Sequence, residues 1–286
     1  MASLRQIRRR MKSVENIHEI TAAMEMIAAF RFKKAETRFS RSKPYLLEME
    51  KLVANLSSSA KDLSDALFEK RDIKTKTLVV MAGDKGLCGA YNTNILKTAA
   101  QWMRDNKGVR TNFVPIGKIG YEFFHKKGHA VLSGYAERSM VDVDFARKVT
   151  EDLKELFLSK KTDSIELLYT TFKVGAAGQN RVVPFLSLSY LMEGGAAKAA
   201  SMDYIYEPDF KGVFLNLLSR YVEGKLYLCL LESLTSEYSA RMMAMKQATE
   251  NGEEVLDDLT LLRNKTRQAT ITRELSEIVG GASILV

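Results

Sequence analysis

A glycine-rich segment at residues 83–89, with the sequence GDKGLCG, is the first stretch whose residue types could carry chemistry. It follows an apolar run and precedes a helical pattern, which is where α/β folds hold a nucleotide phosphate. Its spacing is GxxGxxG, whereas the dinucleotide motif is GxGxxG and the phosphate loop is GxxxxGK[ST]. Residues 101–109, where a ribose-binding acid would stand, contain only Asp105. The spacing therefore favours a tight turn between a strand and a helix over a nucleotide site.

Cysteine and histidine, which often serve as nucleophiles or metal ligands, are scarce: the sequence holds two cysteines and three histidines in 286 residues. Cys88 has no histidine near it in sequence, and we expect a small buried thiol there rather than a nucleophile. His125 and His129 are four residues apart, but no carboxylate or third ligand stands at a metal-binding spacing. GxSxG, HExxH and CxxC motifs are absent from the sequence. We therefore predict no catalytic residues, no cofactor and no metal site.

A basic stretch at residues 31–43, RFKKAETRFSRSK, interleaves Phe32 and Phe39 with cations. The net charge of the chain is +8, and residues 1–43 carry eleven basic against four acidic side chains, so most of the excess is local. Cations mixed with aromatic rings are typical of nucleic-acid binding. The same pattern fits a solvated helix face, or docking on an acidic protein surface.

The composition, with 46% hydrophobic and 27% charged residues, is that of a globular protein and excludes a disordered chain. No apolar run approaches the roughly 18 residues of a membrane span, and two cysteines exclude a disulfide scaffold. The basic N-terminus lacks the apolar core of a secretory signal. A mitochondrial presequence fits the composition, but the helical pattern continues past Glu15 and favours a mature start. We therefore expect an intracellular protein.

The first element that must position these residues is an amphipathic helix over residues 1–58, about 80 Å long if it is straight. Ser3 is a suitable N-cap, and apolar residues then recur at steps of three and four. The expected seam of this helix is Leu4, Ile7, Met11, Val14, Ile17, Ile20, Met24, Ile27, Leu46, Met49, Val53 and Leu56.

A second long helix is predicted over residues 209–286. Its expected seam is Leu234, Tyr238, Met242, Met245, Val255, Leu259, Leu262, Thr266, Ala269, Leu275, Ile278, Ala282 and Leu285. Ordinary globular helices run for about 8–20 residues, so the simplest partner for each long helix is the other. Because both helices connect to the same middle segment, we expect them to run antiparallel as a coiled coil that forms a shaft.

The expected register pairs residue numbers that sum to about 267, if residues 58 and 209 lie side by side. It places an acidic cluster near Arg8, Arg9, Arg10 and Lys12, against residues 9–17. The cluster consists of Glu250, Glu253, Glu254, Asp257 and Asp258. About twenty C-terminal residues, 269–286, are left without a partner in the chain. They are too apolar to stand in water, so something external should surround them.

The middle of the chain, residues 75–200, changes period. Strands are predicted at 77–82, 112–116, 165–172 and 182–190, with a further short strand at 130–132, and helices at 92–105, 119–127 and 142–160. Strands that alternate with helices predict a mainly parallel sheet covered by helices. The expected fold class is therefore a small α/β, Rossmann-like domain at 75–200, inserted between the coiled-coil helices 1–58 and 209–286.

The chain resembles the gamma subunit of the F-type ATP synthase over essentially its whole length. The resemblance lies in IRRRMKSVENIHEITAAMEMIAA at 7–29, GDKGLCGAYN at 83–92, DYIYEPD at 203–209 and a long segment at 240–282. The last segment contains the family's C-terminal signature, Ile271-Thr272-x-Glu274-x-x-Glu277-x-x-x-Gly281-Ala282. Ile284 departs from the small residue that members of the family often have there.

This resemblance implies a non-catalytic rotor shaft, present once per complex, inside a ring of three alpha and three beta subunits. Proton flow through the membrane ring of c subunits turns the foot of the shaft with its epsilon partner. The shaft in turn drives the catalytic beta subunits through their conformations. The implied location is peripheral, on the cytoplasmic face of a bacterial inner membrane, without nucleic acid or a cofactor.

Residue roles are likewise implied by the resemblance. Arg267 and Gln268 resemble contacts to the beta-subunit catch loop, with Met24 nearby, while Thr272 and Glu274 resemble positions that tune coupling. Further contacts to the alpha/beta ring are expected from Arg31, Lys33, Lys34, Ile284 and Leu285, and the foot that meets the c ring is expected at Tyr204 and Glu207. Plant members carry a regulatory cysteine pair in the middle domain. Only Cys88 stands in this region, so we expect no thiol switch and a bacterial source.

Two other functional classes remain as alternatives. A basic coiled coil that binds nucleic acid would lose affinity steeply with salt, and it would leave the apolar C-terminal residues unexplained. A nucleotide-dependent enzyme would need a ligand site within residues 75–200, and the glycine spacing argues against one.

Overall fold

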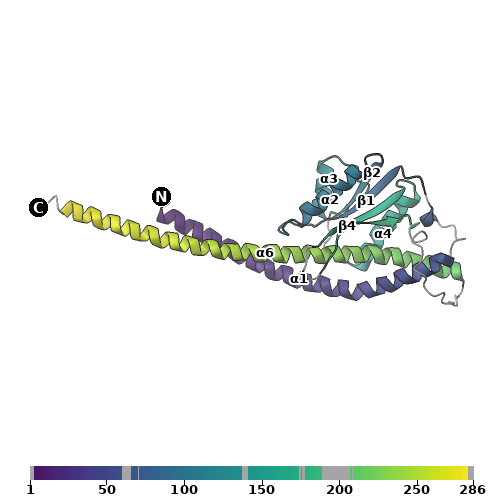
Figure 1. Cartoon of the computed structure of the whole chain (residues 1–286), viewed down its shortest axis with the longest axis horizontal. Coiled ribbons are helices and arrows are strands. Elements are labelled where there is room, and N and C mark those ends of the chain that lie inside the picture. The colour runs from purple at the N-terminus through teal and green to yellow at the C-terminus, as the bar shows by residue number, and fades with distance from the viewer. Residues whose placement is uncertain are drawn as a thin grey trace. The chain divides into compact units, whose positions relative to one another are not determined.

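The computed structural model describes residues 3–59, 66–69, 71–136, 141–173, 175, 178–188, 207 and 209–282. Two long helices, α1 (Leu4–Ser59) and α6 (Phe210–Ala282), stand at the two ends of the chain order. In the described part of the chain between them lie four strands, the short helices α2, α3 and α4, and the 3-10 turn η1 (Ala66–Phe68) (Figure 1). The chain divides into two compact units. We call Met1–Phe30 with Arg241–Val286 the helical unit, and Arg31–Ala240 the sheet unit.

The sheet has the strand order β2-β1-β3-β4. Its strands are β1 (Thr75–Met81), β2 (Arg110–Ile116), β3 (Ser164–Thr170) and β4 (Asn180–Leu186). β1 pairs in parallel with β2 and with β3, whereas β3 and β4 are antiparallel. The last five residues of β1, Thr77–Met81, are buried, as expected for a central parallel strand that is covered on both faces. The prediction of a mainly parallel sheet is confirmed.

Helices cover both faces of the sheet: α2 (Tyr91–Asp105), α3 (Lys118–Lys126) and α4 (Val143–Leu158) (Figure 1). Because successive side chains of a strand point to opposite faces, β1 contributes to two apolar clusters. Leu78 and Val80 pack with residues of α2 and α3, including Trp102. Val79 and Met81 pack with residues of α4, α1 and α6. The sheet is therefore held to both long helices by continuous apolar packing within the sheet unit.

The predicted strand at 130–132 is not an element of the sheet. Val131 and Tyr135 instead form isolated parallel bridges with Phe113 and Ile116 of β2. The segment is too short to form a ladder, but its backbone bonds cover the edge of β2: Phe113 N–H donates to the carbonyl of Ala130 at 2.9 Å.

The long helices pair in antiparallel fashion within each unit. In the sheet unit, Arg38 donates to the Tyr227 hydroxyl at 3.2 Å, and Tyr221 donates to Glu50 at 3.3 Å. In the helical unit, Thr249 donates to the Thr21 hydroxyl at 3.0 Å. The paired residue numbers sum to 265–271, close to the expected 267. The expected pairing and register are confirmed at these contacts.

The predicted seam of α1 is wrong at Ile17, Ile20 and Ile27, which are 53–59% exposed. The inward side chains of α1 instead keep a strict seven-residue repeat. The repeat consists of Leu4, Ile7, Met11, Val14, His18, Thr21, Glu25 and Ala28, all buried or half-buried. After Val14 the prediction chose Ile17 as the next inward residue because it is apolar. In the structure the next inward residue is His18, which the seven-residue spacing requires. A seven-residue repeat keeps one stripe facing a partner helix whatever residues it carries.

The predicted seam of α6 is wrong in the same way at Val255 and Leu262, which are 38% and 44% exposed. The buried or half-buried repeat consists of Met245, Thr249, Gly252, Leu256, Leu259, Arg263, Thr266 and Thr270. The acidic cluster at 250–258 also does not behave as expected. Among the residues described, no ion pair joins it to Arg8, Arg9, Arg10 or Lys12, and Glu250 pairs with Lys246 of its own helix at 3.8 Å. The charges on the two helices thus stay solvated.

Candidate partner-binding surfaces

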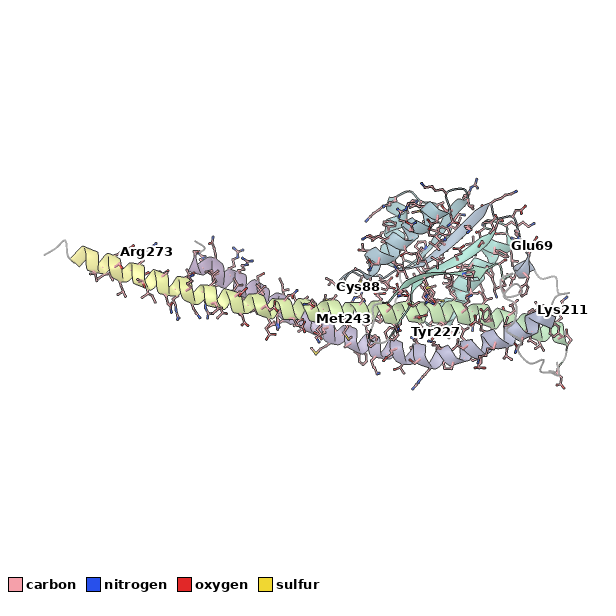
Figure 2. All side chains as sticks on the ribbon, viewed as in Figure 1. Glu69, Cys88, Lys211, Tyr227, Met243 and Arg273 are labelled. Atoms are coloured by element: carbon pink, nitrogen blue, oxygen red, sulfur yellow. The ribbon has the colours of Figure 1, made fainter. Side chains whose placement is uncertain are left out.

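The C-terminal part of α6 is exposed on every side. By the observed register the start of α1 at Leu4 lies level with about residue 266, and each of residues 271–279 is exposed. Four apolar side chains there, Ile271, Leu275, Ile278 and Val279, are 49–67% exposed. The expectation of a segment without a partner in the chain is confirmed for these residues. We call residues 271–279 the exposed tip; Figure 2 labels Arg273 within it.

The positions expected to contact the alpha/beta ring are in part accessible. Arg267, Gln268, Thr272 and Glu274 are exposed on α6, and Met24 is half-buried on α1. The backbone carbonyl of Thr272 accepts a hydrogen bond from the Ser276 hydroxyl at 2.9 Å. Ile284 and Leu285 lie outside the described residues.

The helical unit exposes apolar side chains along its length as well as at the tip. On α1 these include Ile17, Ile20 and Phe30, which is 73% exposed, and on α6 they include Met243 and Leu261. Meanwhile Thr21, Thr249 and Gly252 occupy the seam between the helices. Apolar side chains therefore line both the seam and the outward faces of this unit, whereas an isolated helix pair would keep its outward faces polar.

The basic stretch presents cations but not aromatic rings. Arg31, Lys33 and Lys34 are exposed, and Lys33 pairs with Glu36 at 2.9 Å. Phe32 and Phe39 instead turn toward Phe172, with ring centroids 5.6 Å and 6.3 Å away. Binding of single-stranded nucleic acid relies on aromatic rings that stack on the bases. The rings of Phe32 and Phe39 are instead engaged in packing within the protein. The accessible surface is therefore one of positive charge alone.

Of the two residues expected to form the foot, the structure describes one. Glu207 is exposed. Tyr204 lies outside the described residues, so its expected role stays a prediction.

The glycine segment packs against α6 within the sheet unit (Figure 2, label Cys88). Gly83 N–H donates to Asn92 Oδ1 at 2.8 Å, and Asn92 Nδ2 lies 3.1 Å from Cys88 Sγ. Cys88 is 2% exposed, as expected for a small buried thiol. Gly89 has a φ of +57°, a conformation that glycine adopts without strain. The segment is thus a tight turn that connects β1 to α2.

The turn of α6 that receives this segment was missed by the sequence reasoning. Ser233, Thr235, Ser236 and Glu237 are at most 5% exposed although each is polar. The available signal was their position: they interrupt an apolar run of α6 that ends at Leu231. Their packing partners come from loops far away in sequence, and no periodicity within one helix identifies such partners.

The titratable groups beside this turn are shifted chiefly by burial. Burial raises the pKa of Glu232 above its ordinary 4.5, while the Phe172 amide and the cations Lys43 and Arg181 oppose the rise. Burial also raises the pKa of the Cys229 thiol to about 12. A thiol with such a pKa is protonated at neutral pH and is a poor nucleophile.

No metal-binding group of three His, Cys, Asp or Glu side chains occurs among the residues described. Within the same part of the chain, no helix is long and apolar enough to cross a membrane.

The comparisons with known proteins agree over the full length. A family model described as ATP synthase matches residues 3–285. The ATP synthase gamma chain of Ralstonia nicotianae is 39% identical over 99% of each chain. That of Paracidovorax citrulli is 38% identical, again over 99% of each.

Two solved structures show the same fold. A chain of the Euglena gracilis mitochondrial ATP synthase OSCP/F1/c-ring structure has a TM-score of 0.74 at 17% identity, covering 99% of this chain and 94% of that one. A chain of the central stalk/c-ring structure from Tetrahymena thermophila has a TM-score of 0.61 at 22% identity, covering 80% of this chain and 99% of that one. The nucleic-acid alternative finds no support in these comparisons. The chain belongs to the ATP synthase gamma chain family.

Proposed function

We propose that this chain is the central-stalk rotor of an ATP synthase, which couples ion flow through a membrane ring to conformational cycling of the catalytic beta subunits. The ATP chemistry takes place on other subunits, and this chain transmits rotation. The observation that carries the proposal is the exposed tip: Ile271, Leu275 and Ile278 are 49–67% exposed. A helix end that exposes so much apolar surface needs a surrounding partner.

The outward-facing apolar residues of the helical unit support the same function. Ile17, Ile20 and Ile27 on α1 and Leu261 on α6 would each gain about 1.5–3 kcal/mol if a partner buried them fully. A ring that encloses the helices can contact such side chains on several sides at once. Contacts between a ring and single apolar side chains are non-directional, which suits a shaft that must rotate inside the ring.

The coiled-coil shaft and the domain boundaries belong to this proposal. The seven-residue burial repeats on α1 and α6 support a left-handed coiled coil. Helices 1–58 and 209–286 form the shaft, and residues 75–200 form the inserted α/β domain. A pair of helices resists bending better than one helix does, as transmission of torque requires.

Contacts with the other subunits follow from the accessible residues. Arg267, Gln268, Thr272 and Glu274 contact the alpha/beta ring with Met24 nearby, and Ile284 and Leu285 extend into its sleeve. Arg31, Lys33 and Lys34 face acidic loops of the beta subunits, which long-range charge attraction assists. The foot at Tyr204 and Glu207 meets the c ring and epsilon subunit. The complex places the chain on the cytoplasmic face of a bacterial inner membrane, as a peripheral subunit.

The test is ATP hydrolysis by purified alpha and beta subunits with and without this chain. The full chain is expected to assemble a complex and to raise turnover. A chain that ends at Ala269 removes the exposed tip and should assemble more weakly or give lower turnover.

The matched control keeps the tip and changes only its charge. Arg273 and Glu277 form an exposed ion pair at 3.3 Å, and exposed pairs contribute little. The double substitution Arg273→Gln and Glu277→Gln should therefore leave turnover near that of the full chain. A full chain that neither binds the alpha and beta subunits nor changes their activity would contradict the proposed function.

A further inference from the structure

The sheet unit contains the crevice at which α/β folds usually bind ligands. In the order β2-β1-β3-β4, the connection from β1 leads to β2 on one side, and the chain then crosses to β3 on the other. Ligands of open α/β sheets bind outside the carboxyl ends of the strands at such a reversal. Here β1 ends at Met81 and β3 at Thr170, in parallel. Residues 82–90, and the described residues 171–173, 175, 178 and 179, therefore border the crevice.

The helix α6 meets the carboxyl end of β1 with hydroxyl groups. Ser233 Oγ donates to the Met81 carbonyl at 3.2 Å and lies 2.7 Å from the Tyr91 hydroxyl. Tyr91 also donates to the Ser233 carbonyl at 3.1 Å. Ser233 is fully buried. The last residue of β1, the first turn of α2 and the α6 backbone are thus joined in one buried polar network.

Two glycines allow both bordering segments to approach α6 closely. A side chain on Gly83 would bring a Cβ within 3.1 Å of the Glu237 carboxyl group. A Cβ on Gly178 would lie 2.4 Å from Ser236 Oγ and 2.5 Å from the Thr171 carbonyl, too close for any real side chain. Both contacts fall on the same turn of α6, residues 233–237. We call this turn the polar turn.

The segment after β3 is attached to the preceding residue of α6. Phe172 N–H donates to Glu232 Oε1 at 3.0 Å. The Phe172 ring packs against Phe32 and Phe39 of α1. Phe172 therefore contacts both long helices from one position in the loop.

We propose that the polar turn of α6 occupies the ligand crevice of the α/β fold and forms a rigid joint that transmits rotation between the sheet and the helix. Ser233, Gly83 and Gly178 are positioning residues for coupling in this joint. The inference about coupling rests on the proposed rotor function, whereas the filled crevice stands without it.

The chemistry of the contact fits a joint better than it fits a simple core. Apolar packing is non-directional, so the apolar residues of α6 at 226–231 resist separation but fix rotation about the helix axis weakly. Hydrogen bonds weaken steeply when they bend. The bonds of Ser233 and Glu232 to β1, α2 and the β3 loop fix both the rotation and the axial position of α6.

The first measurement is amide hydrogen exchange on the full-length chain. The variants are Ser233→Ala, Tyr91→Phe and both together, and the reporters are the amides of Gly83 and Phe172 in the two bordering segments. Loss of one or two buried hydrogen bonds should raise exchange at both reporters about two- to tenfold. The control is Thr77→Val, which removes the bond from Thr77 Oγ1 to Thr162 Oγ1 at 2.8 Å near the amino end of β1, away from the polar turn. It should leave both reporters unchanged.

A second arm tests whether the crevice is filled. Addition of millimolar Mg·ATP to the full-length chain should leave exchange at residues 83–92 unchanged. Protection of these amides by the nucleotide would overturn the claim that α6 occupies the crevice. Faster exchange at the Gly83 amide alone, with the Phe172 amide unchanged, would show that the two segments do not form one joint.

A third arm measures coupling in the reconstituted complex, as ions pumped per ATP hydrolysed. The Ser233→Ala and Tyr91→Phe variants should lower this ratio while hydrolysis persists, and Thr77→Val should not. A ratio that stays at the wild-type value in the joint variants would overturn the role in coupling. Failure of every form of the chain to assemble would instead count against the proposed function, and the exchange results would still decide the joint.

Discussion

The sheet unit and the helical unit bury their apolar residues to different extents. In the sheet unit Phe113, Phe157 and Tyr221 are at most 1% exposed. In the helical unit, buried apolar residues among those described are Ile7, Ala28, Met245 and Leu259, whereas Phe30 is 73% exposed. The same two helices, α1 and α6, contribute to both units. The extent to which each helix buries its large apolar side chains thus changes along its length.

This contrast indicates where each unit obtains its stability. The sheet unit has its own apolar core, so its free energy of unfolding should not depend on a partner subunit. The helical unit leaves many of its large apolar side chains exposed to water, and a partner that covers them will stabilise it by mass action. Substitutions in the first unit should therefore act on the isolated chain, and those in the second on the complex.

The largest effect is expected for Phe113→Ala. Phe113 stacks on Phe124 with ring centroids 4.3 Å apart and is 1% exposed, so its truncation should lower the free energy of unfolding by about 3–5 kcal/mol. Trp102, the single tryptophan, lies 6.1 Å from the Phe113 ring and reports unfolding of the sheet unit by fluorescence in urea. Phe30→Ala removes an equal ring from the exposed face of α1 and should change the unfolding free energy by less than about 0.5 kcal/mol. Similar losses for both variants would contradict the contrast.

The next effect is expected in the complex for Leu275→Gln. Leu275 is 57% exposed in the tip, so the isolated chain should unfold as the wild type does. If a ring of alpha and beta subunits buries this side chain, its affinity for the chain should fall by about 1.5–3 kcal/mol, or roughly 10- to 100-fold. Titration of the alpha/beta ring with labelled chain measures this. Arg273→Gln, which changes an exposed neighbour, should bind within about twofold of the wild type. A weak effect of Leu275→Gln would argue against burial of the tip.

A smaller effect is expected for Thr249→Val in the seam of the helical unit. The substitution removes the bond from Thr249 to the Thr21 hydroxyl, and should lower the stability of this unit by about 0.5–1.5 kcal/mol. Thermal unfolding followed by far-ultraviolet circular dichroism measures the change in Tm. The control is Thr270→Val, since Thr270 donates to the Thr266 carbonyl of its own helix at 2.9 Å. Equal changes in Tm would mean that the bond across the seam contributes nothing.

The smallest effect is a change of slope with pH for Glu232→Gln. Because burial raises the folded pKa of Glu232 above 4.5, the folded state binds more protons than the unfolded state between 4.5 and the raised pKa. Stability is therefore greatest below 4.5 and falls as the pH rises through the folded pKa. Glutamine keeps an acceptor for Phe172 N–H and removes the titration, so urea unfolding between pH 4 and 8 should show a flatter dependence, by less than one proton. An unchanged slope would exclude Glu232 as the source.

The elements were predictable wherever local pattern and packing agree. The strand at Thr77–Ala82 was expected and β1 spans Thr75–Met81, because a run of apolar residues between turns suits a central parallel strand. Asp209 was expected near the start of the last helix, and its carboxylate accepts the Gly212 amide at 3.1 Å. Such signals are local: a cap, a turn or an apolar run acts within a few residues.

The seam of the helical unit was less predictable. If burial of apolar area alone determined which side chain faces the partner helix, Ile17 would face inward and its neighbour His18 would not. In the structure His18 packs beside Gly252 of α6, and Ile17 stays outside. The seven-residue repeat outweighs the gain from burying Ile17, because rotating the helix to bury it would move the other inward side chains out of the seam. Surfaces meant for a partner carry apolar residues that an argument from a single chain assigns to the core.

By itself the sequence determined that two long helices flank a small, mainly parallel α/β sheet, that the helices pair antiparallel near a sum of 267, and that residues 271–279 lack a partner in the chain. These follow from length, period and connectivity, which any folded form must satisfy. Only the tertiary structure decided that Glu237 lies buried against Gly83 and Ser233 against Met81, and that Ile17 and Ile20 face outward. Those facts depend on which side chains meet across long stretches of sequence. Close packing decides such contacts through shape and hydrogen-bond geometry, neither of which is written in the order of residues along one helix.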